Sequence, residues 1–377
     1  TGRERNPAGD QFNKFKMENL PAKFLTSSDP VKNLDDFLSQ KEQGQPFWFW
    51  YGSIEPHVKY EKGIGLKNGI DTADIKLPAF VPNQPDAKIE MSDYYFEIEW
   101  FDKQVGWFVD YLEEKGLAEN TIIVVTSDNG IVLPRCKRNL YEYSSRMPLA
   151  IYWPKMKNIG AEIDRLTSFI DFAPTFLELA GIDIPDQMTG KSFAPLFTTE
   201  GISTVNDPEH VLTGFERHDH RRYDNVGYPM RAIRTDRYLF IKNYKPDRWP
   251  EGDPEVNSYG QGVNNTESSW TSNYVYYEPG SELFELAFGK RPARELYDII
   301  QDPVCTNNLA ETKQFRSVAD SLHRILRDKL VKQGDPRELG YGDIFESYPR
   351  HGPMKQYIGG FKERGEYNPK YHVHPSD

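Results

Sequence analysis

The sequence predicts an α/β fold followed by a smaller α+β region built on an antiparallel sheet. In the first region, short apolar runs alternate with segments whose apolar residues recur at helical spacing, as in a parallel sheet flanked by helices. In the second region, alternating segments on either side of a turn indicate antiparallel hairpins. We therefore expect the α/β portion over residues 1–205, the smaller subdomain over 206–340, and a tail that wraps the surface over 341–377.

The elements of the first region follow from its apolar pattern. β-Branched and aromatic runs mark the strands, and apolar residues three and four positions apart mark the helices, one of which Gly116 closes. In chain order we expect a helix at 33–40, a strand at 45–54, a helix at 91–116, a strand at 122–125, a strand at 147–153 and a helix at 167–182.

The elements of the second region are an antiparallel hairpin, a further strand and a long helix. The hairpin spans 228–243 and turns at Thr235-Asp236. A loop rich in Pro, Gly, Asn, Ser and Tyr follows over 244–280, then a strand and turn within 293–310, and an amphipathic helix over 315–334.

Composition narrows the classes of partner. The formal net charge of -11 disfavours a general polyanion-binding surface, nucleic acid included, but leaves room for one local basic pocket. Two cysteines, Cys136 and Cys305, are too few for a disulfide framework, and one long-range disulfide or two free thiols both remain open. No apolar run is long enough to cross a membrane.

Two strands of the predicted sheet end in polar clusters. One is followed by Asp128-Asn129-Gly130, which combines hard oxygen donors with a residue that lets the chain turn, although the same tripeptide is ordinary turn chemistry. The other ends at Glu55-Pro56-His57. Because ligands of open α/β sheets gather outside the carboxyl ends of the strands, we expect His57 and Asp128 to share a pocket.

Four basic residues follow the Asp-Asn pair: Arg135, Lys137, Arg138 and Arg146. Cations beside an acid-amide pair suggest a metal next to a bound anion, which suits phosphoryl or sulfuryl transfer. A run of this kind is also common on a solvated face of a protein.

Several segments together resemble the type I sulfatase family. They are "TIIVVTSDNG", K-x-x-x-Y-E at Lys137 to Glu142, R-x-P-L at Arg146 to Leu149, "FWFWYGSIEPH", "SFIDFAPTFLELAGI", "GKSFAPL" and "ELYDIIQDPVCTNNLA". "GRERNPAG" and "PHVKYEKGIG" are similar to the heparan N-sulfatase, sulfamidase-like branch. The resemblance covers most of the chain as far as about residue 330.

The resemblance implies an alkaline-phosphatase-like mixed sheet, with residues 1–205 forming the C-terminal portion of the catalytic domain. It also implies hydrolysis of a sulfate ester or sulfamate on a sulfated saccharide, in a periplasmic, secreted or lysosomal-type compartment. Carried over to this sequence, Asp128 and Asn129 are expected to bind one Ca²⁺. Lys137 is expected to hold the sulfate and the leaving oxygen, and His57 to bind the sulfate or protonate the leaving group.

The sequence departs from the family at the nucleophile. The family makes a formylglycine from Cys or Ser in a C/S-x-P-S/A-R motif, which is absent here, as are the two N-terminal metal aspartates. "TGRERNPAGDQF" has no signal-peptide features and reads as a loop entered from something upstream. We therefore expect an N-terminal sulfatase segment, in the same or a separate chain, and expect residues 1–377 not to fold stably as an isolated monomer.

Further substrate contacts are expected from "GFERHDHRRY", where Arg217, His218, His220 and Arg222 could grip acidic groups of a sulfated sugar. An exposed charged loop explains the same residues. Two alternatives to a sulfatase remain: a phosphate or phosphonate ester hydrolase of the alkaline phosphatase superfamily, and a non-catalytic protein that binds sulfated glycans. The nucleophile distinguishes the sulfatase from the phosphate or phosphonate hydrolase, and the upstream coding sequence tests the non-catalytic reading.

Overall fold

The computed structural model describes residues 11–201, 207–218, 226–251 and 269–347. The chain forms two compact units. The first comprises residues 1–118 and 267–279, and the second comprises 119–266 and 280–377. The predicted domain boundary near residue 205 stays a prediction.

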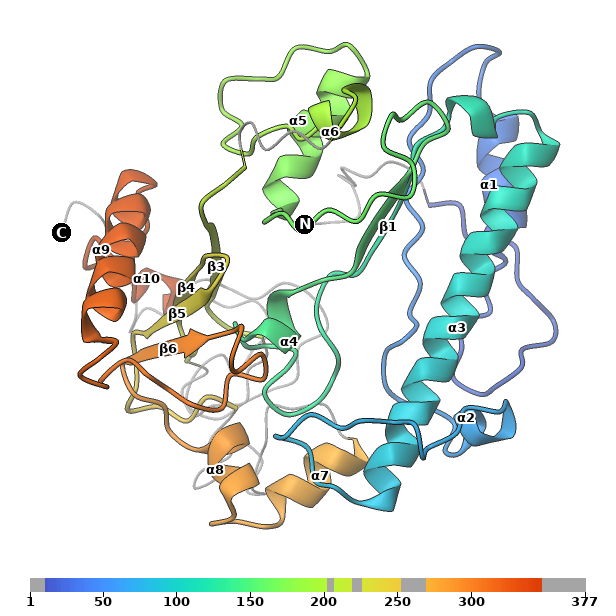
Figure 1. Cartoon of the computed structure of the whole chain (residues 1–377). Coiled ribbons are helices and arrows are strands. Elements are labelled where there is room, and N and C mark those ends of the chain that lie inside the picture. The colour runs from blue at the N-terminus through green and yellow to red at the C-terminus, as the bar shows by residue number, and fades with distance from the viewer. Residues whose placement is uncertain (1–10, 202–206, 219–225, 252–268, 348–377) are drawn as a thin grey trace. The chain divides into compact units, whose positions relative to one another are not determined.

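The first unit is helical in its described part, and α3 is its central element (Figure 1). Each helix begins or ends where its sequence provides a cap: the Asp29 carboxylate accepts the Lys32 N–H at 3.0 Å at the start of α1, and Gly116, with φ of 66°, follows the end of α3. The helices are α1 (Pro30–Ser39), α2 (Ile64–Lys67), α3 (Pro85–Glu114) and α7 (Trp270–Tyr276).

One face of α3 forms the core of this unit. Phe96 and Trp100 pack with Ile64 of α2 and with Ala22 and Leu25 of the segment before α1. The Asp93 carboxylate of α3 accepts the Gly63 and Gly65 N–H groups, each at 2.9 Å, at the start of α2. A Cβ on Gly65 would lie 2.2 Å from the Ser92 carbonyl oxygen, so glycine is needed for the close approach of the two helices.

Glu97 on α3 is a buried carboxyl group, and burial, with the nearby charges of Glu55 and Asp93, raises its pKa to about 8. Because this folded-state pKa exceeds the unfolded value, stability falls as pH rises from about 4.5 through 8. Glu97→Gln should therefore raise the free energy of unfolding by about 2 kcal/mol at pH 8, after allowance for residual hydration, and by almost nothing at pH 4.

Denaturant unfolding of the complete protein at the two pH values measures this difference. Glu99→Gln is the matched control, because Glu99 is exposed on the same helix. An equal effect of Glu97→Gln at both pH values would show that Glu97 is not neutral in the folded protein.

The second unit begins with a two-stranded sheet in which β1 (Ile123–Thr126) pairs antiparallel with β2 (Leu149–Tyr152). The predicted parallel arrangement of these strands is therefore wrong. A parallel pair needs a crossover of a dozen or more residues, usually helical, whereas the connection here contains only the single-turn helix α4 (Glu142–Ser145). The strands are also only partly covered, and Leu149 and Tyr152 are exposed.

The strand predicted at residues 45–54 is also absent. The segment has no regular structure, and Trp48 and Trp50 are 61% and 75% exposed. A strand needs a neighbour for its backbone groups, and no described segment forms a ladder with this one.

The larger sheet of the second unit has the order β3-β4-β5-β6, with every pair antiparallel, as predicted for this region (Figure 1). The expected hairpin is β4 and β5, with the turn beginning at Thr235, whose N–H donates to the Tyr238 carbonyl at 2.9 Å. The strands are β3 (Val211–Phe215), β4 (Met230–Arg234), β5 (Tyr238–Asn243) and β6 (Arg294–Asp298).

Both faces of this sheet are buried. Ile233, Phe240 and Leu296 pack against α9 (Arg316–Lys332), the long helix that the sequence predicts. The opposite face packs against the segment that runs into α4. That cluster contains Met230, Ala232, Leu239, Ile241 and Tyr297 from the sheet, with Leu140 and Tyr141. The sheet therefore supports the segment that carries Lys137.

The remaining elements of the second unit are short helices. Ser168 and Asp171 form a capping box, and the Asp171 carboxylate also accepts the Lys191 N–H at 2.8 Å. No helix in the described part of the chain has the length and hydropathy of a membrane span. The short helices are α5 (Phe172–Leu179), α6 (Pro195–Thr198), α8 (Glu282–Phe288) and α10 (Ile344–Ser347), with 3-10 turns at Ala118–Asn120, which crosses the unit boundary, and Phe169–Asp171.

Candidate active site

Asp128 and Asn129 follow β1, and their side chains are in contact. The Asn129 amide nitrogen donates to a carboxylate oxygen of the exposed Asp128 at 2.6 Å. Gly130 then passes so close to α4 that its N–H donates to the Ser144 carbonyl at 3.0 Å, and a Cβ would lie 1.8 Å from the Tyr143 carbonyl oxygen. The φ angle of Gly130 is not positive, so other residues could adopt its backbone conformation. Glycine is needed at this position because a side chain would not fit.

The Asp128–Asn129 pair fits Ca²⁺ in the kind of donor but not in number. A carboxylate and an amide offer hard oxygen atoms, whereas calcium takes six to eight of them. The described residues contain no cluster of three or more His, Cys, Asp or Glu side chains that could hold a metal. The pair could therefore contribute to a calcium site but does not form one.

Lys137 lies in a tight loop that is held in place by contacts of its buried neighbours. Its own N–H donates to the Ile131 carbonyl at 3.0 Å, and its side chain is only partly buried. The neighbouring Arg135 is buried: it donates to the Leu286 carbonyl at 2.6 Å and to the Cys305 carbonyl, and its guanidinium lies 4.0 Å from the centre of the Tyr141 ring. These contacts of Arg135 hold the loop, and Lys137 itself is only partly buried.

Two buried carboxylates complete the anchor of the loop. Glu251 accepts the Asn139 amide N–H at 2.9 Å and lies 3.7 Å from the Arg138 guanidinium. Glu295 of β6 accepts the hydroxyl groups of Tyr141 at 2.8 Å and Tyr297 at 2.6 Å.

The predicted group of four cations at an anion site is therefore wrong for two of its members. Arg135 and Arg138 are buried and hold the loop in place. Lys137 is partly exposed and Arg146 is exposed, so for these two the anion role stays a prediction.

His57 is an exposed residue of the first unit. Its N–H donates to the Ile54 carbonyl at 3.0 Å, and its ring Nδ1 lies 2.6 Å from the Val58 carbonyl oxygen. Because a carbonyl oxygen only accepts, Nδ1 donates a proton in this arrangement. The predicted pocket shared by His57 and Asp128 stays a prediction, since the two residues belong to different units.

Arg217 and His218 lie after β3, separated from its end by one residue, and are partly buried. The preceding residue, Glu216, is held by two arginines, Arg231 and Arg337. His220 and Arg222, the other two predicted substrate contacts, lie outside the described residues.

Cys136 and Cys305 are both free and buried, which decides between the alternatives that the sequence leaves open. Burial raises the pKa of the Cys305 thiol to about 12 and that of Cys136 well above its usual range. Since the thiolate is the reactive form, neither cysteine is suited to act as a nucleophile.

Two family models match the chain. The sulfatase model matches residues 6–182, and the model of the C-terminal region of N-sulphoglucosamine sulphohydrolase matches residues 135–257.

Curated relatives match at low identity over most of this chain. An ulvan-active sulfatase from Formosa agariphila is 27% identical over 309 residues, which cover 79% of this chain and 47% of the relative. Human N-sulphoglucosamine sulphohydrolase is 27% identical over 338 residues, which cover 80% of this chain and 63% of the relative. The chain thus spans about half to three fifths of the length of these relatives.

Solved structures share the fold. One, from work on a Bacteroides thetaiotaomicron locus for the metabolism of multiple glycosaminoglycans, has a TM-score of 0.58 at 21% identity and covers 82% of this chain and 59% of its own. The phosphonate monoester hydrolase from Silicibacter pomeroyi has a TM-score of 0.57 at 18% identity and covers 81% of this chain and 60% of its own. This likeness confirms the predicted alkaline-phosphatase-like α/β fold.

Proposed function

Because the chain belongs to the sulfatase family, we propose that it forms part of an enzyme that hydrolyses a sulfate ester or sulfamate on a sulfated saccharide. The observation that carries the proposal is the loop of Lys137, which buried side chains hold nine positions after Asp128 while leaving the lysine itself partly exposed. The names of the relatives, an ulvan-active sulfatase and an N-sulphoglucosamine sulphohydrolase, support this substrate class.

The nucleophile in this proposal is a formylglycine from a sulfatase segment that these 377 residues do not contain. The sequence has no C/S-x-P-S/A-R motif, and its two cysteines are buried thiols. That segment is the proposed partner of this chain.

Lys137 and His57 would then divide the work on the leaving group. The Lys137 ammonium stabilises negative charge on the sulfate and on the leaving oxygen as the bond to sulfur breaks. His57 gives that oxygen a proton from Nε2, because its Nδ1 is engaged by the Val58 carbonyl.

Asp128 and Asn129 would hold one side of a calcium ion, after rotation of the Asn129 amide turns its oxygen toward the metal. The ion, when bound, supplies positive charge beside the sulfate. Other ligands come from the same segment as the nucleophile.

Arg217 and His218, with His220 and Arg222, are the proposed contacts to acidic groups of the saccharide. In a chain of net charge -11, a local cluster of this kind would give the substrate an electrostatically favourable place to bind. We further propose a periplasmic, secreted or lysosomal-type compartment, where a sulfated-glycan substrate would be found.

A phosphonate ester hydrolase is the second candidate, since the Silicibacter pomeroyi enzyme shares the fold. A metal, a lysine and a histidine would serve a phosphonate as well as a sulfate. Both matching family models favour the sulfatase.

Asp128→Ala in the complete enzyme should lower kcat/KM for a sulfated glucosamine by about 10³-fold or more and reduce bound calcium, because the ion loses a carboxylate ligand. Activity and metal content are measured together, with the exposed Asp186 changed to Ala as the matched control.

Full activity and full calcium content in Asp128→Ala would disprove the metal role. If the unaltered enzyme cleaves an aryl phosphonate ester faster than any sulfated sugar, the second candidate is correct.

A further inference from the structure

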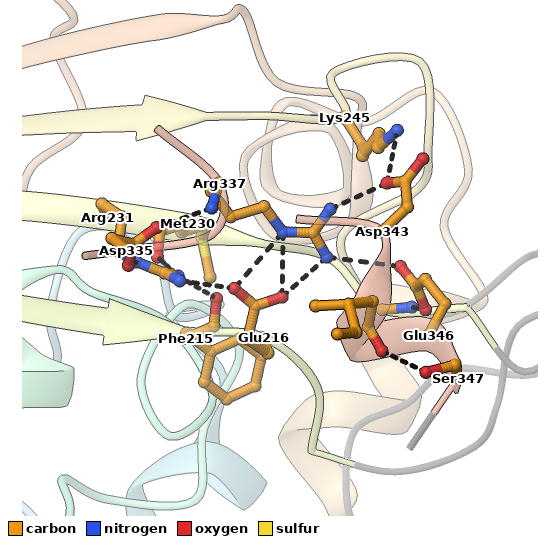
Figure 2. A network of polar contacts seen from close by, with 12 residues as sticks. Phe215, Glu216, Met230, Arg231, Lys245, Asp335, Arg337, Asp343, Glu346 and Ser347 are labelled. Carbon is orange, nitrogen blue, oxygen red and sulfur yellow. Dashed lines mark hydrogen bonds and ion pairs between the residues drawn. The ribbon is translucent and has the colours of Figure 1, made fainter. Parts of the chain in front are cut away.

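Eight charged side chains of the second unit form one network beside β3 and β4 (Figure 2). Its acids follow β3, follow α9 or lie on α10. One base lies on β4, two follow β5 and one follows α9. The four acids are Glu216, Asp335, Asp343 and Glu346, and the four bases are Arg231, Lys245, Arg248 and Arg337.

One part of this network holds Glu216, the residue just before Arg217 and His218. Arg337 donates to one Glu216 carboxylate oxygen from Nη2 at 2.8 Å and from Nε at 3.2 Å. Arg231 lies 2.6 Å from the other oxygen. Charge-assisted bonds from two guanidinium groups fix this carboxylate in direction as well as in place.

The other part holds Gly227, where the chain returns to β4. Its N–H donates to one Glu346 oxygen at 2.8 Å, and its carbonyl accepts from Arg248 at 2.7 Å. A Cβ on Gly227 would lie 2.4 Å from the Glu216 carbonyl oxygen, which accepts the Tyr228 N–H at 2.9 Å. The two ends of the segment between β3 and β4 are therefore tied to each other.

Arg337 contacts the carboxylate of Glu216, at the start of the segment between β3 and β4, and that of Glu346, which binds Gly227 near its end. Besides Glu216, its Nη2 lies 3.6 Å from Glu346, and its Nη1 lies 3.0 Å from Asp343. Its side chain is only 3% exposed, and its guanidinium lies 5.4 Å from the centre of the Phe345 ring. Buried ion pairs add little net stability compared with apolar packing, so a network of this size is better explained by the geometry that it imposes.

We propose that Arg337 is a positioning residue for substrate binding, which fixes Glu216 and Gly227 so that Arg217 and His218 face an acidic group of the sulfated saccharide. This inference rests on the proposed function, because it takes Arg217 and His218 as substrate contacts. The network itself is charge-balanced, with four acids and four bases, so its own charges offset one another beside Arg217 and His218.

Arg337→Lys tests the proposal, since lysine keeps the charge but loses the fork that contacts Glu216 through two nitrogens. In the complete enzyme, with a sulfated disaccharide as substrate, KM should rise about 10-fold while kcat stays within about 2-fold. Glu346→Gln, which weakens the other end, should act in the same direction. Arg316→Lys is the matched control, because Arg316 is 60% exposed and its contact with Glu311 is 3.8 Å long.

The decisive measurement repeats Arg337→Lys in a variant that already carries Arg217→Ala and His218→Ala. If Arg337 acts through these residues, the further rise in KM disappears, whereas any loss of thermal stability persists. An equal rise in both backgrounds, or a loss of stability without a change in KM, would assign Arg337 a structural role only. If Arg217→Ala with His218→Ala leaves KM unchanged, the proposed substrate contacts fail, and the positioning role fails with them.

Discussion

Lys137→Ala is expected to lower kcat of the complete enzyme by about 10²-fold or more while the protein remains folded. The lysine side chain is partly exposed, and the loop that carries it is held by neighbours instead: Arg135 through the Leu286 carbonyl, Asn139 through Glu251, and Tyr141 through Glu295. Removing the ammonium should therefore lower the proposed charge stabilisation while these three anchors of the loop stay in place. Steady-state kinetics with a sulfated saccharide, beside thermal unfolding, measure both quantities.

Three further variants are compared with Lys137→Ala. His57→Ala is expected to lower kcat to a similar extent, as a lost general acid would. Arg135→Ala should instead reduce stability and yield, because it leaves buried carbonyl groups without their donor. Lys313→Ala, an exposed lysine of the same unit, should be silent. A Lys137→Ala protein that unfolds readily, yet turns over normally in its folded fraction, would reassign the lysine to the structure of the loop.

Gly130→Ala is expected to disrupt the site from a position that bears no functional group. The added methyl would lie 1.8 Å from the Tyr143 carbonyl oxygen and 2.8 Å from its carbon, and backbone atoms cannot move aside as a side chain would. Separation of the two segments also breaks the bond from the Gly130 N–H to the Ser144 carbonyl. We expect a loss of about 2–4 kcal/mol in the free energy of unfolding, together with loss of activity because Asp128 and Asn129 shift.

Gly106→Ala is the matched control for this change. Gly106 lies within α3, and a Cβ there would meet no atom within 4 Å. The free energy of unfolding should rise by about 0.5–1 kcal/mol, as for glycine in a helix interior. If Gly130→Ala proves equally harmless, the segment after β1 does not approach α4 as closely as the structure has it.

The sequence predicts best those elements whose pattern is local. The hairpin of β4 and β5 has alternation on both arms and a Thr-Asp turn, and α9 has a full helical periodicity, so both lie where they are expected. The pairing of β1 with β2 cannot be read from a local sequence pattern, because it depends on how the chain folds between the two strands. Apolar runs indicate strands but do not state their direction, and the connection between β1 and β2 contains a single turn of helix in place of a crossover helix.

The functional side chains are predictable to a similar degree. Asp128, Asn129 and Lys137 could be chosen because hard donors and a cation after an apolar run suggest a site, and their roles stay predictions. Their supports could not be chosen. Glu251 and Glu295 read as surface acids, since charged residues are mostly exposed, and only the tertiary fold brings them to Asn139 and Tyr141.

Glu251 and Glu295 hold the loop of Lys137 through residues 138–141. Substitutions in these two distant parts of the sequence are therefore expected to depend on each other. A relative that altered Glu251 or Glu295 would have to alter the partner residues between Arg135 and Tyr141 in compensation. A chimera that took residues 206–347 from another sulfatase would thus also exchange Glu251 and Glu295, which hold the Lys137 loop. If Lys137 and Arg217 have the roles proposed above, an exchange of specificity in this region would also change the turnover number.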